Sequence, residues 1–335
     1  MNIFHNSFHN QHRPPNEIFN GNRESHQEVP ERVDQILRAL KKAKHLVKDL
    51  QPNLHDRQEL LKVLRQVHTN DYVEYLQSGN FDNNYLYPSV FSYRDEASAS
   101  QHPVALRGFY SFDTYTPLSN TTFEAALGSA FLARHAALDV FEKGETQYAL
   151  CRPPGHHAEP ARMGGYCYFN NGGVAAQTFR NANHQNRIAI LDIDFHHGNG
   201  VEEIFKDDEA MLTISIHADP NEKFPYFSGW ETNKYVSNRN FSLPLGTDNI
   251  QYDKTLQLAL DEIRHHRTTH LVVCFGADTH ESDPIGGFKL TTSYYTEIAR
   301  QISDLKMPTV IIQEGGNNTE VLGDNVVSFL SGFTL

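Results

Sequence analysis

Short, continuous apolar runs recur along the chain and alternate with longer amphipathic segments. The apolar runs predict strands at Tyr148–Arg152, Ile188–Asp194, Met211–His217, Leu271–Phe275 and Thr309–Gln313. The segments Phe123–Glu142, Tyr252–His266 and Ser293–Leu305 have the spacing of helices. Strands that are apolar on both faces and alternate with helices indicate a parallel sheet covered on both sides, which is an α/β fold.

Chemically suggestive residues follow these strands, in the segments CRPPGHH, DIDFHHGNG, SIHADP, FGADTHESDP and QEGGNN. Ligands bind outside the carboxyl ends of the strands in parallel sheets. Because all of these segments would meet at one edge of the sheet, the pattern predicts one site in one domain. A length of 335 residues is compatible with a single large α/β domain.

Two regions lack a regular pattern. Residues 9–30 mix His, Asn, Arg and Pro before a helix that is expected to begin at Pro30 and Glu31. Residues 78–121 form a long polar and aromatic insertion. Loops of this length are usually functional or interfacial, and a disordered excursion is the less favoured alternative because Phe and Tyr are frequent in it.

Composition narrows the classes of function. The net charge of −12 argues against nucleic-acid binding and favours cationic ligands such as amines. The odd, sparse set of cysteines (Cys151, Cys167 and Cys274) fits free buried thiols in a reducing compartment. The N-terminal segment has no apolar core of signal-peptide length, and no apolar run is long enough to span a membrane. We therefore expect a cytoplasmic protein without a membrane or nucleic-acid partner.

The stretch Ile190–Gly200, ILDIDFHHGNG, is the strongest chemical signal. Alternate residues of a strand point to the same side, so Asp192, Asp194 and His196 are expected to converge while His197 points elsewhere. Carboxylates and an imidazole at a strand end suit a divalent metal such as Zn²⁺ with an open position. A buried strand ending in a solvated turn is the less favoured alternative.

Asp283 follows the strand that ends at Phe275, and we predict that it brings a further carboxylate to Asp194 and His196. A plain Asp-Pro turn is the alternative reading. An open three-ligand site leaves room for water, whose pKa the metal would lower to about 7.

His156 and His157 follow CRPPG and are candidates for a general acid and base. Asp192 is a candidate to orient one ring and Asn199 the other. A carboxylate partner favours imidazolium and an amide partner favours neutral imidazole, so the pair is expected to divide into stabiliser and base. Two surface histidines in a turn are the alternative.

Gly165 and Tyr166, in GGYCY, and Phe224, in FPY, are candidates for the walls of a narrow apolar slot, with core packing as the alternative. Asp113, in SFDTYTP, is either a turn residue or a clamp for a substrate amine or amide N–H.

The motifs CRPPGHHA, MGGYCYFNN, AILDIDFHHGNG, GADTHESDP and QEGG, in this order, resemble those of the zinc-dependent histone deacetylase superfamily, and most closely its bacterial acetylpolyamine amidohydrolases. The resemblance covers nearly the whole chain. It implies an arginase/deacetylase-type three-layer α/β sandwich with a mainly parallel eight-stranded sheet, as one domain over residues 1–335.

The resemblance also assigns roles. Asp194, His196 and Asp283 match the ligands of one Zn²⁺ per chain, His157 matches the general base and acid, and His156 matches its companion.

Further matches concern the substrate and a second ion. Tyr166 and Phe224 match the aromatic pair of the acyl-lysine tunnel, Leu290 a residue at its mouth, and Asp113 the rim aspartate. The insertion at 78–121 looks like the one that dimerises in acetylpolyamine amidohydrolases, which implies a homodimer. The family's structural monovalent-cation site, usually potassium, is matched by Asp192, Asp194, His196, Ser215 and Ile216.

One position departs from the family pattern. A tyrosine that stabilises the oxyanion usually follows EGG, whereas this chain has Asn317. Losing one oxyanion donor typically lowers turnover by about 10²–10³-fold. Either Asn317 acts through a water, or another group substitutes, or the protein is slow on acetyl substrates; whether the asparagine is natural or engineered is left open. Tyr115 falls near a rim position that is acidic in the closest relatives, which weakens a strict polyamine assignment.

Three functions follow, in order of preference. The first is a zinc-dependent amidohydrolase that removes acetyl or related acyl groups from small cationic amines or from lysine. The second is a weakly active or inactive binder of the same acyl compounds, because of Asn317. The third is a two-metal ureohydrolase, which would need further carboxylates that DIDFHHGNG does not supply.

Overall fold

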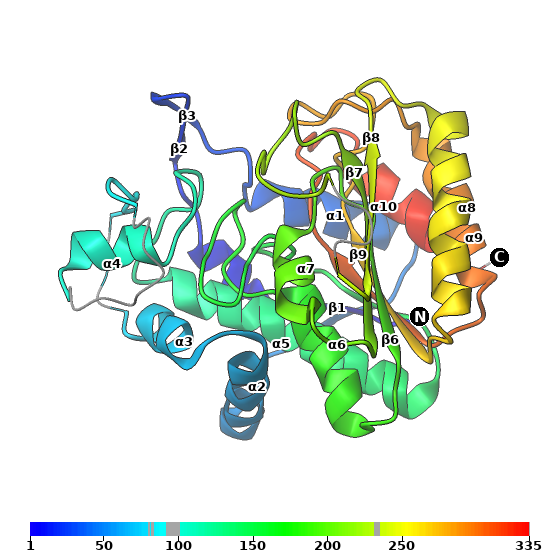
Figure 1. Cartoon of the computed structure of the whole chain (residues 1–335), viewed down its shortest axis with the longest axis horizontal. Helices are drawn as coiled ribbons and strands as arrows, with labels where there is room; N and C mark the ends of the chain where they lie inside the picture. Colours follow the sequence, from blue (N-terminus) through cyan, green and yellow to red (C-terminus); the bar gives the residue numbers. More distant parts are fainter. Residues whose placement is uncertain (80, 82–83, 92–100, 231–234, 335) are drawn as a thin grey trace.

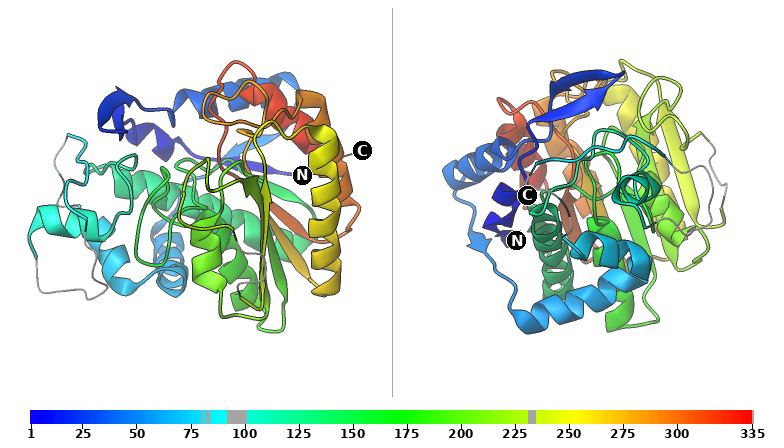
Figure 2. Two further views of the ribbon diagram at one scale, coloured as in Figure 1. Left: turned by 45° about the horizontal axis from the view of Figure 1, so that its top comes forward. Right: turned by 90° about the vertical axis from the view of Figure 1, so that its left-hand side faces the viewer.

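The computed structural model describes residues 1–79, 81, 84–91, 101–230 and 235–334. In this part of the chain, eight strands form one sheet in which every pair of neighbours is parallel, and helices cover both faces (Figures 1 and 2). The predicted three-layer α/β fold is therefore confirmed. The strands in sheet order are β4 (Val47–Asp49), β1 (Ile3–His5), β5 (Gln147–Ala149), β10 (Thr309–Gln313), β9 (His270–Phe275), β6 (Ile188–Asp192), β7 (Met211–Ala218) and β8 (Asn238–Leu243).

Each face of the sheet carries its own hydrophobic core. One core includes residues of α2 (Leu54–Val67), α3 (Asn70–Gln77), α5 (Thr122–Lys143), α6 (Asn171–Ala182) and α7 (Asn199–Phe205). The other includes residues of α1 (Glu31–Lys42), α8 (Asn249–His265), α9 (Thr292–Ser303) and α10 (Leu322–Ser331). The two cores share one sheet and thus belong to one layered unit.

Strand β6 shows why the apolar runs are continuous. Ile188 and Ile190 pack into the first core, whereas Ala189 and Leu191 pack into the second. Successive side chains of a strand point to opposite faces, so a strand covered on both sides has no solvent-facing positions.

The five predicted strands are confirmed as β5, β6, β7, β9 and β10, and the predicted helices as α5, α8 and α9, with ends that differ by a few residues. The edge strands β4 and β8 and the short β1 were not predicted. The edge sequences VKD and NRNFSL are short or polar, because an edge strand has fewer neighbours to bury it. Strand β1, IFH, lies inside the sheet, but its three residues are too few to form a recognisable apolar run.

The two regions without a regular pattern contain structure. Residues 9–30 include the end of the 3₁₀ helix η1 (Ser7–Gln11) and the antiparallel hairpin β2 (Asn16–Phe19) and β3 (Asn22–Ser25), which lies apart from the main sheet in Figure 1. The helix expected after Pro30 is α1.

The insertion at 78–121 includes the helix α4 (Pro103–Phe109) and a bridge between Leu86 and Leu118. Residues 80, 82–83 and 92–100 of the insertion lie outside the described residues, and the homodimer expected from it stays a prediction. Among the described helices, none has both the length and the apolar character that crossing a membrane requires.

Candidate active site

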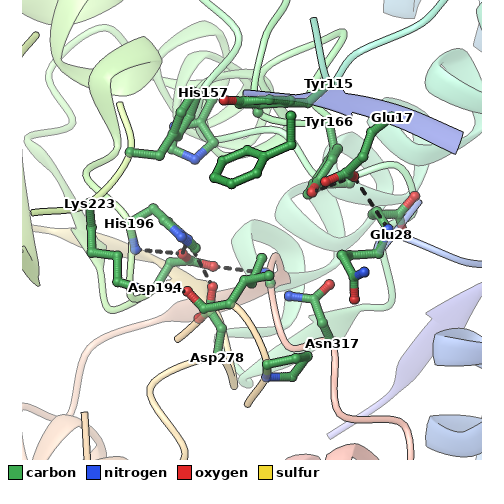
Figure 3. Close-up of a pocket in the computed structure, with 18 of the residues that line it drawn as sticks. Glu17, Glu28, Tyr115, His157, Tyr166, Asp194, His196, Lys223, Asp278 and Asn317 are labelled. Carbon is green, nitrogen blue, oxygen red and sulfur yellow. Dashed lines mark hydrogen bonds and ion pairs between the residues drawn. The ribbon is translucent and has the colours of Figure 1, made fainter. Parts of the chain in front are cut away.

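Three potential metal ligands meet at the carboxyl ends of β6 and β9. Ligand atoms of Asp194, His196 and Asp278 all lie within 4.8 Å of one another (Figure 3). His196 Nδ1 lies 3.2 Å from Asp194 Oδ1 and 3.1 Å from Asp278 Oδ2. The two strands are neighbours, with Asp192 in register with Cys274, so residues just beyond their ends are brought together. The expected meeting of ligands at this edge is therefore observed, with a change in one member.

That change concerns Asp283, which the sequence analysis wrongly placed among the ligands. Asp283 Oδ2 accepts the backbone N–H groups of Asn317 at 2.6 Å and Asn318 at 3.2 Å, and its Oδ1 accepts that of Ile285. Asp278 takes the ligand position instead. It lies immediately beyond the end of β9 at Phe275, whereas Asp283 lies farther along the same loop. The distance along the chain from the end of β9 is the sequence signal that favours Asp278 over Asp283 as a ligand.

The alternation expected for the DIDFH segment persists although the strand does not. Strand β6 ends at Asp192. Beyond it, Ile193 and Phe195 still pack into the second core, while Asp194 and His196 face the site. The apolar side chains thus anchor the segment that presents the polar ones.

The local charges fit a divalent cation. Burial and the nearby Asp194 carboxylate raise the pKa of Asp278 to about 7. Two carboxylates and one imidazole suit Zn²⁺ and leave a coordination position open. The loop after β10 also closes on this group, because Gly315 donates its N–H to Asp194 Oδ2 at 2.8 Å. A Cβ on Gly315 would lie 2.5 Å from that oxygen, so only glycine permits the approach.

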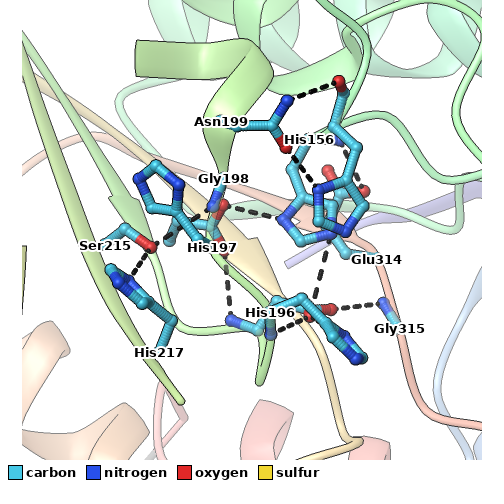
Figure 4. Close-up of polar contacts among 12 residues, drawn as sticks. His156, His196, His197, Gly198, Asn199, Ser215, His217, Glu314 and Gly315 are labelled. Atoms are coloured by element: carbon cyan, nitrogen blue, oxygen red, sulfur yellow. Dashed lines mark hydrogen bonds and ion pairs between the residues drawn. The ribbon is translucent and has the colours of Figure 1, made fainter. Parts of the chain in front are cut away.

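The paired histidines lie beside the three ligands: His156 Nε2 is 3.7 Å from Asp194 Oδ1, and the His157 ring centroid is 6.0 Å from that of His196. The two histidines have different partners, and Figure 4 shows His156 together with His196 and Asn199. His156 Nδ1 lies 2.9 Å from Asp192 Oδ2, and His157 Nδ1 lies 2.7 Å from Asn199 Oδ1. Their ring centroids are 3.9 Å apart. The structure thus brings together the pairs that the sequence analysis expected.

The partners divide the pair electrostatically. Burial disfavours a charged His156, but Asp192 and Asp194 outweigh it and raise its pKa to about 10. Burial, followed by the neighbouring His156 and His196, holds the pKa of His157 well below the usual value. These surroundings favour a charged His156 and a neutral His157. Neutral His157 donates Nδ1–H to Asn199, which leaves its Nε2 as a proton acceptor.

A cavity of about 350 Å³ opens over these groups. Its walls include Gly165, Tyr166 and Phe224, as expected, and also Tyr115. The Phe224 ring centroid lies 4.9 Å from that of His157. Gly165 has a φ of +54°, and a Cβ there would lie 2.1 Å from His157 Cδ2, so the wall touches the histidine closely. The site is a narrow aromatic slot that ends at the histidine pair.

Two of the residues expected to contact substrate do not line the cavity. Leu290 is fully buried in the second core and does not line the cavity; Pro284 and Ile285, from the same loop, do. Asp113 is also buried and absent from the lining, because its carboxylate accepts backbone N–H groups from Gly165, Tyr115 and Thr116. Asp113 therefore holds the wall of the slot in place, with Gly165 as one of its donors.

Asn317 lines the cavity, as its position after QEGG predicts. Its loop is fixed from behind by Arg32, whose Nε donates to Gly316 O and whose guanidinium also donates to Glu314 O, both at 2.6 Å. Arg32 and its 2.7 Å partner Glu28 were not identified from sequence. They lie in or next to a segment that has no recognisable motif.

Acidic residues of the N-terminal segment also reach the cavity, and the sequence analysis did not find them. Glu17 and Glu24 line it, and so does Glu28, which is buried and paired with Arg32 and Arg152. Glu17 Oε2 accepts the Tyr166 hydroxyl at 2.8 Å, and burial raises the pKa of Glu17. The hairpin β2–β3 brings Glu17 and Glu24 to the slot, and no local sequence signal predicts that contact.

The residues expected around a monovalent cation are neighbours. Asp192 of β6 is in register with Ser215 of β7, and Ser215 Oγ lies 3.4 Å from the N–H of Gly198. The Ile216 side chain packs into the second core, which leaves its backbone for any such role.

The chain is similar in sequence and fold to deacetylases and amidohydrolases. Residues 26–333 match the model of the histone deacetylase domain. Acetylpolyamine amidohydrolase 2 of Pseudomonas aeruginosa is 36% identical over 285 residues, which cover 82% of this chain and 83% of the relative. Acetylpolyamine amidohydrolase 1 of the same organism is 34% identical over 339 residues, covering 97% and 96%. The crystal structure of acetylpolyamine aminohydrolase from Burkholderia pseudomallei has a TM-score of 0.92 at 30% identity and covers 99% of this chain and 98% of that one.

Proposed function

Because this chain belongs to the histone deacetylase family, we propose that it hydrolyses the amide bond of acylated amines with one Zn²⁺ held by Asp194, His196 and Asp278. The observation that carries the proposal is the position of this ligand group beside two histidines with opposite charge preferences, at the end of one slot.

A divalent ion in this group would polarise the substrate carbonyl and acidify a water molecule. Zn²⁺ is favoured because the ligand set combines carboxylates with an imidazole and leaves a position open. By family resemblance, we also propose K⁺ near Asp192 and Ser215, where it would serve as a structural ion.

The chain's own groups account for the proton transfers. His157 Nε2, neutral and facing the slot, takes the proton of the attacking water, while Asn199 fixes its tautomer. His156 stays charged against Asp192 and stabilises the negative charge that develops on the carbonyl oxygen. His157, once protonated, returns its proton to the departing amine nitrogen. Phe224 and Tyr166 exclude bulk water from these steps.

The substrate is proposed to be a linear acyl-amine that carries positive charge. The aromatic walls suit an alkyl chain, and the carboxyls of Glu17 and Glu24 suit distant amino groups, whereas Glu28 is already paired with Arg32 and Arg152. The relatives named acetylpolyamine amidohydrolases support the same substrate class. Acyl-lysine in a peptide meets the same slot and is the second candidate.

Asn317 supports the alternative of a slow enzyme or a binder. Its amide is shorter than a tyrosine side chain, and its backbone N–H is already bound to Asp283. An acetyl oxyanion would then lack one donor. The ureohydrolase alternative has less support. Among the described residues, the second potential ligand group contains a thiol and shares no carboxylate with Asp194, His196 and Asp278 that could bridge two metal ions.

The test is a turnover screen of zinc-loaded protein on N-acetylputrescine, N-acetylspermidine and acetyl-lysine peptides, with metal quantified in each sample. We expect measurable hydrolysis that is lost in Asp194→Ala and His157→Ala. Tight binding of acyl-amines without turnover would favour the binder. Turnover that survives both substitutions would refute the hydrolase mechanism.

A further inference from the structure

A second group of potential ligands lies behind the histidine pair. His156, Cys167 and Glu314 are all buried, and one ligand atom from each lies within 4.8 Å of the other two. Figure 4 shows Glu314 next to His156, on the side away from Ser215 and His217. The group shares no member with Asp194, His196 and Asp278, and the proposed reaction uses neither Cys167 nor Glu314.

Glu314 has a carboxylate oxygen available for a ligand. Its Oε2 accepts the backbone N–H groups of Gly155 at 2.6 Å and His156 at 3.2 Å. Its Oε1 is buried and has no hydrogen-bond partner among the described residues. A buried carboxylate oxygen without a partner is destabilising, and burial raises the pKa of Glu314 to about 7. A cation or a proton next to Oε1 would remove this penalty.

The three free cysteines surround this carboxyl. Burial, and then the charge of Glu314, raise the pKa of Cys151, Cys167 and Cys274. Cys167 is the cysteine that is grouped with both His156 and Glu314. Its backbone follows Tyr166 on the wall of the slot, and its thiol lies 3.3 Å from Gly165 O.

We propose that His156, Cys167 and Glu314 form a second, inhibitory site for a thiophilic divalent cation such as Cd²⁺ or excess Zn²⁺. Thiolate, imidazole and carboxylate together are a ligand set for such ions. Metal–ligand bonds of about 2.0–2.3 Å need the ligand atoms to approach by about 1 Å, which side-chain rotation supplies. The thiol and the imidazolium release their protons to water as the metal binds.

Inhibition follows from the role of His156. Its Nδ1 is engaged by Asp192, so Nε2 is the nitrogen that would coordinate; Nε2 lies 3.7 Å from Asp194 Oδ1, so an ion bound there would border the first ligand group. A metal-bound Nε2 can no longer donate a hydrogen bond to an oxygen of the substrate in the slot. His156 also lines the cavity, which gives the ion a route to the group. Only this inhibitory consequence depends on the proposed hydrolase; metal binding does not.

The test is a titration of Cd²⁺ into protein that already holds one equivalent of Zn²⁺, followed by sulfur-to-metal charge-transfer absorption. Asp194, His196 and Asp278 contain no sulfur, so this band cannot arise at the catalytic group. We expect a thiolate band that saturates at one Cd²⁺ per chain, with parallel loss of turnover. A wild-type protein without the band would overturn the proposal, whatever its activity.

The matched variants are Cys167→Ser and Cys151→Ser, since both thiols are buried beside the same carboxyl; Cys274 is left unchanged, because its thiol interacts directly with Glu314. We expect Cys167→Ser to lose the band and to retain turnover in Cd²⁺ relative to its own Cd²⁺-free rate. Cys151→Ser is expected to behave as wild type, and Glu314→Gln is expected to bind Cd²⁺ at least tenfold more weakly. A band that persists in folded Cys167→Ser would overturn the assignment.

Discussion

Asp283 accepts the backbone N–H of Asn317 at 2.6 Å, and the same oxygen accepts that of Asn318 at 3.2 Å. One carboxylate from the loop after β9 therefore fixes the segment after β10 that carries the unusual asparagine. The other end of this segment is fixed by Gly315, which donates to Asp194. The segment that carries Asn317 is thus hydrogen-bonded on one side to Asp194, a proposed metal ligand, and on the other to Asp283.

This relationship separates the roles of two aspartates in one loop. We expect Asp278→Asn to lose the bound metal, because it removes a ligand, and Asp283→Asn to retain it. Asp283→Asn should instead lower turnover and destabilise the protein by about 1.5–3 kcal/mol, since a charged acceptor of two N–H groups is lost. Metal analysis with thermal unfolding checks both variants. A metal-free Asp283→Asn would restore the assignment made from the sequence.

The centre of the sheet was predictable from the sequence, and its edge was not. The central strands were predictable because Ile188–Asp192 and Thr309–Gln313 are buried on both faces and read as continuous apolar runs. The residues that follow them were predictable as site residues because parallel strands end at a common edge. The edge strand β8 was not, because NRNFSL alternates weakly and carries polar side chains.

The errors in the site have a different cause. Asp278 and Asp283 lie in the same loop, and composition alone cannot tell which of them turns toward His196. The contact of Glu17 with Tyr166 joins residues far apart in the chain. This contact depends on how the hairpin β2–β3 packs over the slot, and the pattern of apolar and polar residues does not predict that packing.

Asn317 is expected to limit turnover. Restoring the family tyrosine in Asn317→Tyr should raise kcat on acetyl substrates by about 10²–10³-fold, because an oxyanion donor is regained. Metal content should not change, since Asn317 is not a ligand. Steady-state kinetics with metal analysis checks this. An unchanged kcat would mean that another group of the chain already supplies the donor.

The histidine pair predicts the pH dependence of turnover. Activity requires neutral His157, whose pKa is held low, and charged His156, whose pKa is raised to about 10. As the pH increases, activity should therefore rise to its plateau before pH 6.5 is reached, and it should fall again only in the alkaline range. Asp192→Asn removes a charge that raises the pKa of His156, so the alkaline limb should move to lower pH.

The matched variant for this prediction is Asn199→Asp. A carboxylate beside His157 raises its pKa, so the acidic limb should move to higher pH while the alkaline limb stays. Profiles of kcat/KM against pH for both variants distinguish the two histidines. Identical profiles would show that neither ring controls the rate in this range.

Glu17 is expected to select charged substrates. Glu17→Gln should raise KM for N-acetylspermidine roughly tenfold with little change in kcat, because a carboxylate partner for the distant amine is lost. Tyr166→Phe is the control for the hydrogen bond. It removes the hydroxyl that donates to Glu17 and leaves the Glu17 carboxylate in place. For a neutral acyl-amine, KM should change neither in Glu17→Gln nor when the salt concentration is raised. An equal rise in KM for neutral and charged substrates would mean that Glu17 only supports the slot wall.

Gly315 offers the sharpest steric test of the metal group. A Cβ there would lie 2.5 Å from Asp194 Oδ2 and 2.4 Å from Asp278 Oδ2, so Gly315→Ala must push the loop away from both ligands. We expect metal affinity to fall by about 10- to 100-fold, as it does when groups that orient metal ligands are lost. Gly144→Ala is the control: its φ is +71° and its added Cβ would meet nothing within 4 Å, so it should lower stability without changing metal affinity. Competition with a metal chelator measures the difference. If Gly315→Ala held the ion as tightly as wild type, the carboxylates of Asp194 and Asp278 would not both be ligands in the arrangement described.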